Sequence, residues 1–362
     1  MIPVLRPRLP PADRLVPYLA AIDQSRIYSN FGAQARAFEE RLSSHFALET
    51  GTITTIANAT LGLVLALTGQ GARPGTLCAM PGWTFVASAN AAILAGLTPY
   101  FIDVNPSTWA LDPFAIEEEL ARAPAAVGAI MVVAPFGQPI DYASWDNFKF
   151  RTGLPVVIDA AAAFDSLQVG EAPAVVSLHA TKILGVGEGG FVASRDASII
   201  GAIRQRSNFG FDRNRRAVMA GVNAKLSEYH SVIGLASLDL WSKTRAAWMS
   251  VAGSYRQALA KSNHINLQPG FGETWVSSTC IISVGAGVHA KVQQTLAAAG
   301  IETRLWWGNG AHSQPATAEF PRARLPVTEN LARSTFGLPF YQDLQEDQVQ
   351  HIVATLIAAA SS

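Results

Sequence analysis

The sequence predicts an α/β protein with a mainly parallel central sheet flanked by helices and a smaller C-terminal α+β domain. About half of the 362 residues are apolar and only 15% are charged, so we expect a sizeable buried core. Short apolar runs alternate with helical stretches through the first two thirds of the chain, and this pattern changes after about residue 240. We therefore expect a large domain over residues 1–242 and a small domain over residues 243–362.

The expected large domain contains six short apolar runs with the character of buried strands, and most of them alternate with helical stretches. Continuous apolar strands that alternate with helices indicate a mainly parallel sheet covered on both faces, with the active site at the carboxyl ends of the strands. The expected strands are 76–80, 98–102, 128–134, 154–159, 174–178 and 190–194. The expected helices are 33–47, 60–70, 84–95, 113–122 and 142–150.

The expected small domain has a different order of elements. A long helix is expected over 243–262 and a strand over 276–284. Two further helices are expected near 289–299 and 345–359, and a segment rich in Gly, Pro and Trp, 304–326, lies between them. This order is typical of a smaller α+β domain.

The composition excludes several classes of function. Lys and Arg together number 27, as do Asp and Glu, so there is no basic surplus for nucleic acid. No run of about 18 apolar residues is present, so we expect no membrane span, and the N-terminus lacks the order of a signal peptide. Cys78 and Cys280 lie far apart and match no metal spacing, so we expect a cytoplasmic protein without a metal site.

A lysine follows the expected strand 174–178 and precedes a glycine-rich run. The residues Ser177 to Lys182 are followed by Gly185, Gly187, Gly189 and Gly190, and glycines let a backbone turn sharply beside a bulky cofactor. Because the lysine comes before the glycines, a nucleotide P-loop is disfavoured. From composition alone, such a lysine is more often an ordinary exposed residue.

An acid ends another expected strand. Asp159 closes 154–159, where it could hold a cofactor's pyridine nitrogen protonated. The alternative is an aspartate that caps the next turn, and the residue alone does not separate the two. Pyridoxal 5'-phosphate (PLP) needs a lysine for a Schiff base, an acid against the ring nitrogen, a wall for the ring and donors for the phosphate. Lys182 and Asp159 supply the first two.

Candidates for the other two requirements lie earlier in the chain. Asn58, Ala59 and Thr60 begin an expected helix, and a helix N-terminus offers free N–H groups and a positive dipole end to a phosphate. Phe85 could stack on a ring. Asn and Thr are also standard helix caps, and an aromatic residue in a helix is more often part of the core. The order of these candidates along the chain, together with Lys182, favours a PLP site.

With these residues in this order, the chain resembles the PLP-dependent sugar-nucleotide aminotransferases of the DegT/StrS type, which have the fold type I aminotransferase fold. The resemblance runs from about residue 28 to the C-terminus. It is carried by the spacing from Ser177 to Lys182, by Asp159-Ala160-Ala161, by 84–88, and by an opening motif that begins at Tyr28. Asn58-Ala59-Thr60 stands where the family usually has Ser-Gly-Thr, and 221–226 is similar to a Gly-x-Asn-x-[Arg/Lys] segment.

The resemblance implies a role for each matched residue. It implies Lys182 as the Schiff-base lysine and Asp159 as the partner of the pyridine nitrogen. It implies that Phe85 stacks on PLP and that Ser177 binds the phosphate with the start of the helix at 58–60. It implies that Asn223 reaches the phosphate in the other subunit's site, so a homodimer with shared active sites is expected.

The sequence departs from the family pattern at two positions. Ala59 replaces a glycine, which ordinary backbone angles would tolerate. Ala162 stands where relatives usually have Gln or His near the cofactor hydroxyl, and alanine cannot hydrogen-bond there, so a water or another side chain would have to substitute.

The activity implied is transfer of an amino group from an amino acid, with glutamate or glutamine as donor, to a keto sugar linked to a nucleotide. Tyr28 is a candidate substrate residue, as are four residues of the 304–326 segment: Arg304, Trp306, Trp307 and His312. Packing between the two domains is the alternative for the latter four. Relatives that remove a sugar hydroxyl carry His in place of the lysine, so Lys182 argues against that reaction.

Two other functions stay open at the level of sequence. The first is amination of another ketone, such as a keto-cyclitol, because the cofactor motifs would be the same. The second is a regulatory protein that kept the fold and lost turnover. Lys182, Asp159 and Asn223 speak against the second, and Ala162 leaves it open.

Overall fold

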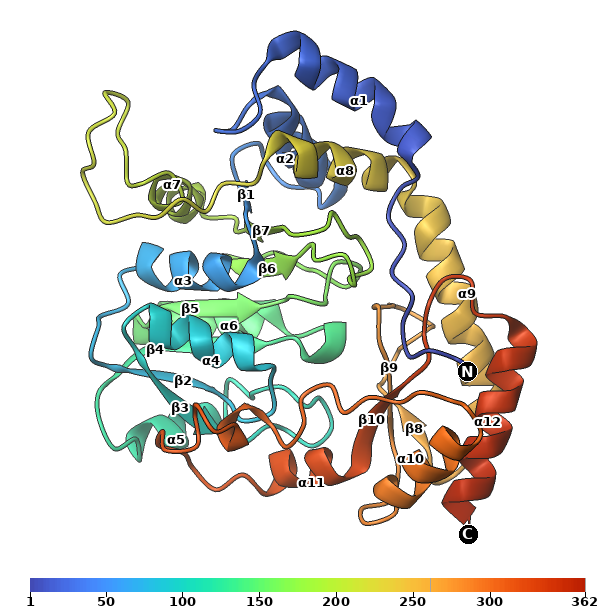
Figure 1. Cartoon of the computed structure of the whole chain (residues 1–362). Coiled ribbons are helices and arrows are strands. Elements are labelled where there is room, and N and C mark those ends of the chain that lie inside the picture. Colours follow the sequence, from blue (N-terminus) through green and yellow to red (C-terminus); the bar gives the residue numbers. More distant parts are fainter. Residues whose placement is uncertain (261, 362) are drawn as a thin grey trace.

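Two β-sheets and the helices around them make up the structure, a computed structural model that describes residues 1–260 and 262–361 (Figure 1). The larger sheet has seven strands in the order β1-β7-β6-β5-β4-β2-β3. Its strands are β1 (Ile53–Ile56), β2 (Leu77–Pro81), β3 (Thr98–Ile102), β4 (Val127–Val133), β5 (Val156–Asp159), β6 (Ala174–Ser177) and β7 (Gly190–Ala193).

The expected mainly parallel sheet is confirmed. Strands β2 to β6 pair in parallel, and β7 is antiparallel to both of its neighbours, β6 and β1. Strand β7 runs the other way because the glycine-rich segment after β6 returns the chain alongside that strand without a crossover helix. All six expected strands exist, with ends within two residues of those expected from the sequence.

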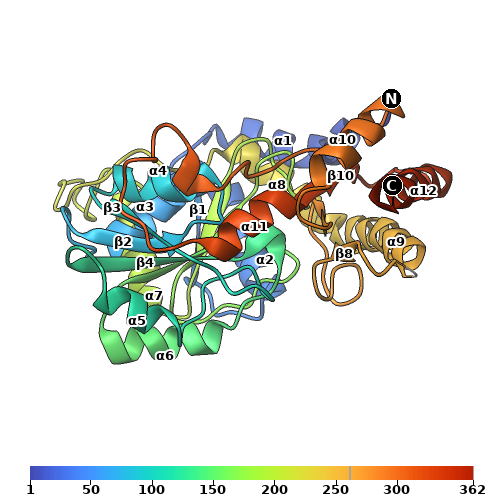
Figure 2. The same ribbon diagram turned by 90° about the horizontal axis from the view of Figure 1, so that it is seen from below.

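Helices cover both faces of this sheet, as Figure 2 shows for α3 and α4 on one face and α5 and α6 on the other. Along β4, Ile130 and Val132 belong to the core beneath α6, whereas Ala129 and Met131 belong to the core beneath α3 and α4. This alternation follows from the period of two in a strand. The helices are α3 (Ala59–Gly69), α4 (Val86–Leu94), α5 (Ile116–Ala121), α6 (Tyr142–Thr152) and α7 (Ala197–Arg206).

A second group of helices packs at the β1 edge of the sheet. It comprises α1 (Ala12–Ser25), α2 (Ala33–His45) and α8 (Glu228–Asp239). The Glu228 carboxylate accepts hydrogen bonds from the backbone N–H groups of Gln34 and Ala35, so it caps α2 from another helix. We did not predict α1 or α8 from the sequence. The apolar residues of α8 are spread around the helix, so no single-face pattern marks it.

The C-terminal part is built on a three-stranded sheet of order β10-β9-β8. The expected helix over 243–262 corresponds to α9, although residue 261 lies outside the described residues. The first residues of the chain, which we expected in the large domain, also contact this part, since Ile2 pairs with Ile301. The elements are α9 (Trp241–Leu259), β8 (Asn266–Leu267), β9 (Cys280–Ser283), α10 (His289–Ala298), α11 (Pro326–Ser334), β10 (Thr335–Leu338) and α12 (Glu346–Ser361).

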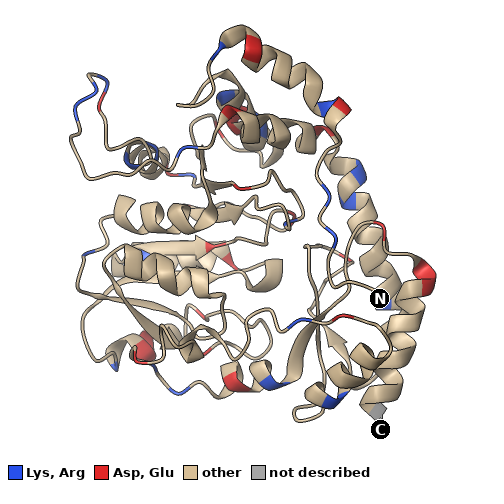
Figure 3. Ribbon diagram, viewed as in Figure 1, with Lys and Arg blue, Asp and Glu red and all other residues tan. Residues whose placement is uncertain are grey.

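Charge is unevenly distributed over the helices. Figure 3 shows no Lys, Arg, Asp or Glu on α3 or α4, and Ile93 and Leu94 at the end of α4 are 38% and 65% exposed. No described helix is long and apolar enough to cross a membrane. The described residues contain no cluster of three or more potential metal ligands.

Candidate active site

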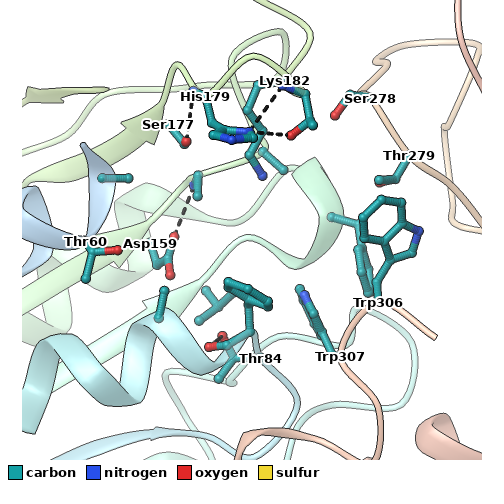
Figure 4. Close-up of a pocket in the computed structure, with 18 of the residues that line it drawn as sticks. Thr60, Thr84, Asp159, Ser177, His179, Lys182, Ser278, Thr279, Trp306 and Trp307 are labelled. Carbon is teal, nitrogen blue, oxygen red and sulfur yellow. Dashed lines mark hydrogen bonds between the residues drawn. The ribbon is translucent and has the colours of Figure 1, made fainter. Parts of the chain in front are cut away.

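A cavity of about 460 Å³ opens at the carboxyl ends of β4, β5 and β6, where a mainly parallel sheet is expected to bind its ligand. Figure 4 shows Thr60, Asp159, Ser177 and Lys182 facing it from one side and Trp306 and Trp307 from the other. Eleven of the residues expected at the site line it. They are Asn58, Ala59, Thr60, Phe85, Asp159, Ala162, Ser177, Lys182, Arg304, Trp306 and Trp307.

Asp159 is the last residue of β5 and is 6% exposed. Its Oδ2 accepts a hydrogen bond of 2.6 Å from Ser88 on α4, and its Oδ1 accepts one of 3.1 Å from the Ala161 N–H. Burial raises the pKa of Asp159, while these two donors and the charge of Lys182 oppose the rise. The carboxylate is thus oriented by its neighbours and keeps acceptor capacity for a cationic group in the cavity.

Lys182 lies in the loop between β6 and β7. Its backbone N–H donates to the His179 carbonyl, and His179 Nδ1 is 2.8 Å from the Thr181 hydroxyl, so the loop is a compact turn (Figure 4). Desolvation lowers the pKa of the Lys182 ammonium, against the opposing charge of Asp159. A lowered pKa makes the neutral, nucleophilic amine more available near neutral pH. Among the described residues that line the cavity, Lys182 is the one lysine.

The start of α3 forms a cradle of backbone donors. Asn58 caps this helix because its Oδ1 accepts from the Leu61 N–H, which leaves the amides of Ala59 and Thr60 in the unpartnered first turn. Gly190 packs closely against the start of α3: a Cβ there would lie 2.8 Å from the Val176 carbonyl oxygen and 3.1 Å from the Ala59 nitrogen, so a side chain at position 190 would displace this helix start. Together with the Ser177 hydroxyl, this cradle fits a phosphate.

Phe85 and Ala162 also line the cavity. Phe85 comes directly before α4, not inside it as expected, and its side chain is 54% exposed. The departure from the family pattern at Ala162 falls at the site. The lysine, the acid, the donor cradle and the exposed aromatic ring all fit a PLP molecule.

Two hydroxyl residues that line the cavity were not predicted from the sequence. Ser278 and Thr279 lie before β9, in a stretch that we expected to be strand, and Figure 4 shows both beside Trp306. They belong to a run of three hydroxyl residues, 277–279, that directly precedes the apolar residues of β9, and nothing in this run shows which side chains face a cavity.

An ion pair fixes the loop that carries these hydroxyls. The Asp165 carboxylate, with its side chain 4% exposed, receives two hydrogen bonds from the Arg245 guanidinium of α9 and one from the Val276 N–H. Bidentate pairs of this kind fix geometry as well as charge. The clamp ties the C-terminal part of the chain to the segment that follows Asp159.

Three expected site residues do not line this cavity. Tyr28 is 47% exposed and stacks on Tyr229, at the β1 edge of the sheet. His312 is 6% exposed and buried near Phe101, because the turn that carries it folds inward behind the cavity wall. Asn223 lies at the base of a projecting loop, 208–223, and its Oδ1 accepts from Lys225 Nζ (Figure 1).

The chain matches known proteins over nearly its whole length. A model of the DegT/DnrJ/EryC1/StrS aminotransferase family matches residues 12–357. A relative from Pseudomonas aeruginosa, UDP-2-acetamido-2-deoxy-3-oxo-D-glucuronate aminotransferase, is 29% identical over 90% of this chain and 90% of its own.

Solved structures agree with the sequence matches. One from Bacillus cereus ATCC 10987, described as a PLP-dependent aminotransferase, is 31% identical with a TM-score of 0.92 and covers 98% of this chain and 99% of its own. Another, DesI in the presence of its TDP-sugar product, is 29% identical with a TM-score of 0.88 and covers 100% of this chain and 94% of its own.

Proposed function

This chain belongs to the DegT/DnrJ/EryC1/StrS aminotransferase family and is a PLP-dependent transaminase, and from that premise we propose that it moves an amino group from glutamate to a keto sugar linked to a nucleotide. The observation that supports the proposal most is the meeting of Lys182, Asp159 and the bare start of α3 in one cavity. These are the three groups that a phosphorylated pyridine aldehyde requires.

We assign the cofactor contacts as follows. Lys182 would hold PLP covalently, Asp159 would pair with its ring nitrogen and Phe85 would cover the ring. The amides of Ala59 and Thr60 and the hydroxyl of Ser177 bind the phosphate, and Asn58 acts indirectly, as the cap that leaves those amides free. When bound, PLP supplies an aldehyde that bonds to amines and a ring that takes up electrons from the adjacent carbon.

The chain's own residues then supply orientation and proton transfer. Lys182 Nζ would be the base that takes a proton from the α-carbon of the donor, and in the second half of the reaction it would give a proton to the acceptor carbon that receives the amino group. Its lowered pKa favours the neutral form that this role needs. Asp159, held by Ser88 and Ala161, keeps the pyridine nitrogen protonated.

The acceptor enters from the side of Arg304 and Trp306. The Arg304 guanidinium lies 5.0 Å from the Trp306 ring centroid, at the mouth of the cavity. A guanidinium in this place suits a diphosphate. Two relatives are consistent with such a substrate, since one is named for a UDP-linked sugar and the other was solved with its TDP-sugar product.

We further propose a cytoplasmic homodimer with shared sites. The uncharged helices α3 and α4, with exposed Ile93 and Leu94, form a surface that a second subunit would cover. The loop 208–223 projects from the chain, and Asn223 lies at its base, where we propose that it contacts the phosphate in the partner's site (Figure 1).

The test has two stages. Addition of glutamate to the PLP-loaded protein is expected to shift the cofactor absorbance, and a panel of UDP-, dTDP- and GDP-linked keto sugars is expected to reverse the shift. A keto-cyclitol that reverses it better than every nucleotide sugar would replace the proposed acceptor. No spectral response to glutamate, glutamine or any other amino acid would indicate a protein without turnover.

A further inference from the structure

The first residues of the chain, 2–9, form a strap that runs from the C-terminal part to the loop after β6. Figure 1 shows this strap descending from α1 beside α9. Near its start, the Phe340 N–H donates to the Val4 carbonyl over 3.0 Å. Near its end, Leu9 packs against the glycine-rich segment, since a Cβ at Gly185 would lie 3.0 Å from Leu9 Cδ2. The strap therefore joins the two parts of the chain that form the active site.

A small cavity of about 10 Å³ is lined in part by this strap. It adjoins the main cavity, because Leu5, Thr181, Lys182 and Ser278 line both. Figure 4 shows Lys182 and Ser278 on the same side of the main cavity. The rest of the lining comes from the strap, from α9 and from the residues after β10. A space of this size holds about one water molecule and excludes a substrate or a cofactor.

One buried donor at the small cavity has no partner. Trp248 of α9 lines the cavity and is 6% exposed. Its indole Nε1 is buried and makes no hydrogen bond within the described part of the chain. The Trp248 ring centroid lies 5.0 Å from that of Phe340, which lines the same cavity. A buried N–H without an acceptor is costly, so an acceptor in this space stabilises the protein.

Other polar side chains around the small cavity complete the hydrogen bonding that a water needs. Ser278 and Gln342 line it, and their side chains make no hydrogen bond with another described residue. A hydroxyl and an amide can each donate and accept. A buried water usually makes two to four hydrogen bonds, and Trp248, Ser278 and Gln342 offer three.

A small anion is the alternative occupant, since Arg6 and Arg8 also line the small cavity. The Arg6 guanidinium is already 3.5 Å from the Asp343 carboxylate and 5.5 Å from the Tyr341 ring centroid. Both arginines are exposed, so solvent and salt screen their charge. The buried donor is the neutral indole of Trp248, and these groups together favour water over an anion.

We infer that one water molecule occupies the small cavity, accepts a hydrogen bond from Trp248 Nε1 and connects α9 to the turn that carries Lys182. Trp248 is then a positioning residue, which acts on Lys182 through the water and does not touch the cofactor. A bridging water is nearly as favourable as a direct hydrogen bond, so it restricts the turn as a direct contact would. The role of Trp248 rests on the proposed attachment of PLP to Lys182, whereas the water site does not.

A high-resolution crystal structure of the PLP-loaded protein tests the water site. We expect one water oxygen within about 3.2 Å of Trp248 Nε1. No density at this place would overturn the inference. Crystals soaked in bromide are expected to show no anomalous peak in the small cavity, and a peak there would mean an anion site in place of the proposed water.

Trp248→Phe tests the positioning role, because it keeps an aromatic ring and removes the indole donor. Equilibrium dialysis compares PLP with pyridoxamine 5'-phosphate, which has an amine in place of the aldehyde and forms no bond with Lys182. We expect Trp248→Phe to weaken PLP binding about three- to tenfold and to change pyridoxamine 5'-phosphate binding less than about twofold. Equal weakening of both ligands would contradict the positioning role, because a general loss of structure affects both.

Trp145→Phe, at a buried tryptophan of α6 away from the site, is the matched control. It is expected to leave both affinities unchanged. The density in the wild-type crystal does not depend on how either variant folds. Failure of the wild type to bind PLP would overturn the proposed function and the role of Trp248 with it, while the crystal density still decides on the water.

Discussion

The Ser88 hydroxyl donates a hydrogen bond of 2.6 Å to Oδ2 of Asp159 at the base of the cavity. Ser88 is fully buried on α4, and its hydroxyl is also 2.8 Å from that of Thr84, so the serine is held in place from both sides. This contact links the helix that follows Phe85 to the acid that we assign to the pyridine nitrogen.

We predict that Ser88→Ala weakens PLP binding by about three- to tenfold, since loss of one hydrogen bond to a charged group costs about 1 kcal/mol or more. The pH dependence follows from the direction of the change. The Ser88 donor lowers the pKa of Asp159, so its loss raises that pKa further. In Ser88→Ala the Asp159 carboxylate is therefore protonated at a higher pH than in the wild type, and protonation removes the charge that pairs with the ring nitrogen. Equilibrium dialysis of PLP from pH 8 down to pH 5 measures this.

Ser107→Ala, at an exposed loop position, is the matched control for Ser88→Ala. Unchanged PLP affinity across the pH range in Ser88→Ala would show that Asp159 does not depend on Ser88 for its charge.

Ala162→Gln is predicted to change the pH titration of the bound cofactor's absorbance. Ala162 lines the cavity and has no hydrogen-bonding side chain, whereas glutamine brings a donor close to the assigned PLP position. Ala143→Gln, on the exposed side of α6, is the control and is expected to titrate as the wild type does. A titration curve of Ala162→Gln that overlays the wild-type curve would place position 162 away from the cofactor hydroxyl.

The Asp165 clamp is predicted to contribute to stability and to the acceptor site together. Asp165→Asn weakens the pairing with Arg245, and we expect it to lower the free energy of unfolding by about 1–3 kcal/mol, because the aspartate is buried and the arginine is partly exposed. We also expect a raised KM for the acceptor, since Val276 leads to Ser278 and Thr279. Urea denaturation and steady-state kinetics measure the two effects.

The exposed pair of Glu117 and Arg151 supplies the control for the clamp. Glu117→Gln is expected to change the free energy of unfolding by less than about 1 kcal/mol and to leave KM unchanged. If Asp165→Asn behaves like Glu117→Gln, the clamp has no special role.

The six strands from β2 to β7 along the chain and the carboxyl-end location of the site could be predicted from the sequence, because apolar runs are local signals. Asp159 and Lys182 were found in this way. Strand β1 and the order of the strands in the sheet were not predicted. The antiparallel direction of β7 could not be predicted, since a buried strand has the same composition in either direction. Nor could the positions of Ser88 beside Asp159 and of Trp248 beside Phe340, which depend on contacts between segments far apart in the chain.

The position of the His312 side chain could not be predicted from the segment in which it lies. It lies among residues that do reach the cavity, yet the turn at 311–313 buries it against Phe101, and no local pattern distinguishes an inward turn from an outward one. Tyr28 was inferred from a motif alone, and the structure places it beside Tyr229 at the other edge of the molecule.

The proposed shared site predicts complementation between subunits. Lys182→Ala removes the proposed covalent attachment in its own cavity, and Asn223→Ala removes a contact that we assign to the partner's cavity. Co-expressed, they form mixed dimers in which one cavity has both residues intact. We expect activity above the average of the two separate variants. Activity equal to that average would mean that Asn223 acts within its own subunit or not at all.

The most direct test of the account is the site of cofactor attachment. Borohydride reduction of the PLP-loaded protein, followed by proteolysis and mass spectrometry, fixes the cofactor to the lysine that holds it. We predict a pyridoxyl-phosphate mass on Lys182 and on no other lysine, with neither attachment nor transamination in Lys182→Ala. A label on a different lysine of the wild type, or transamination by Lys182→Ala at the wild-type rate, would contradict the central claim.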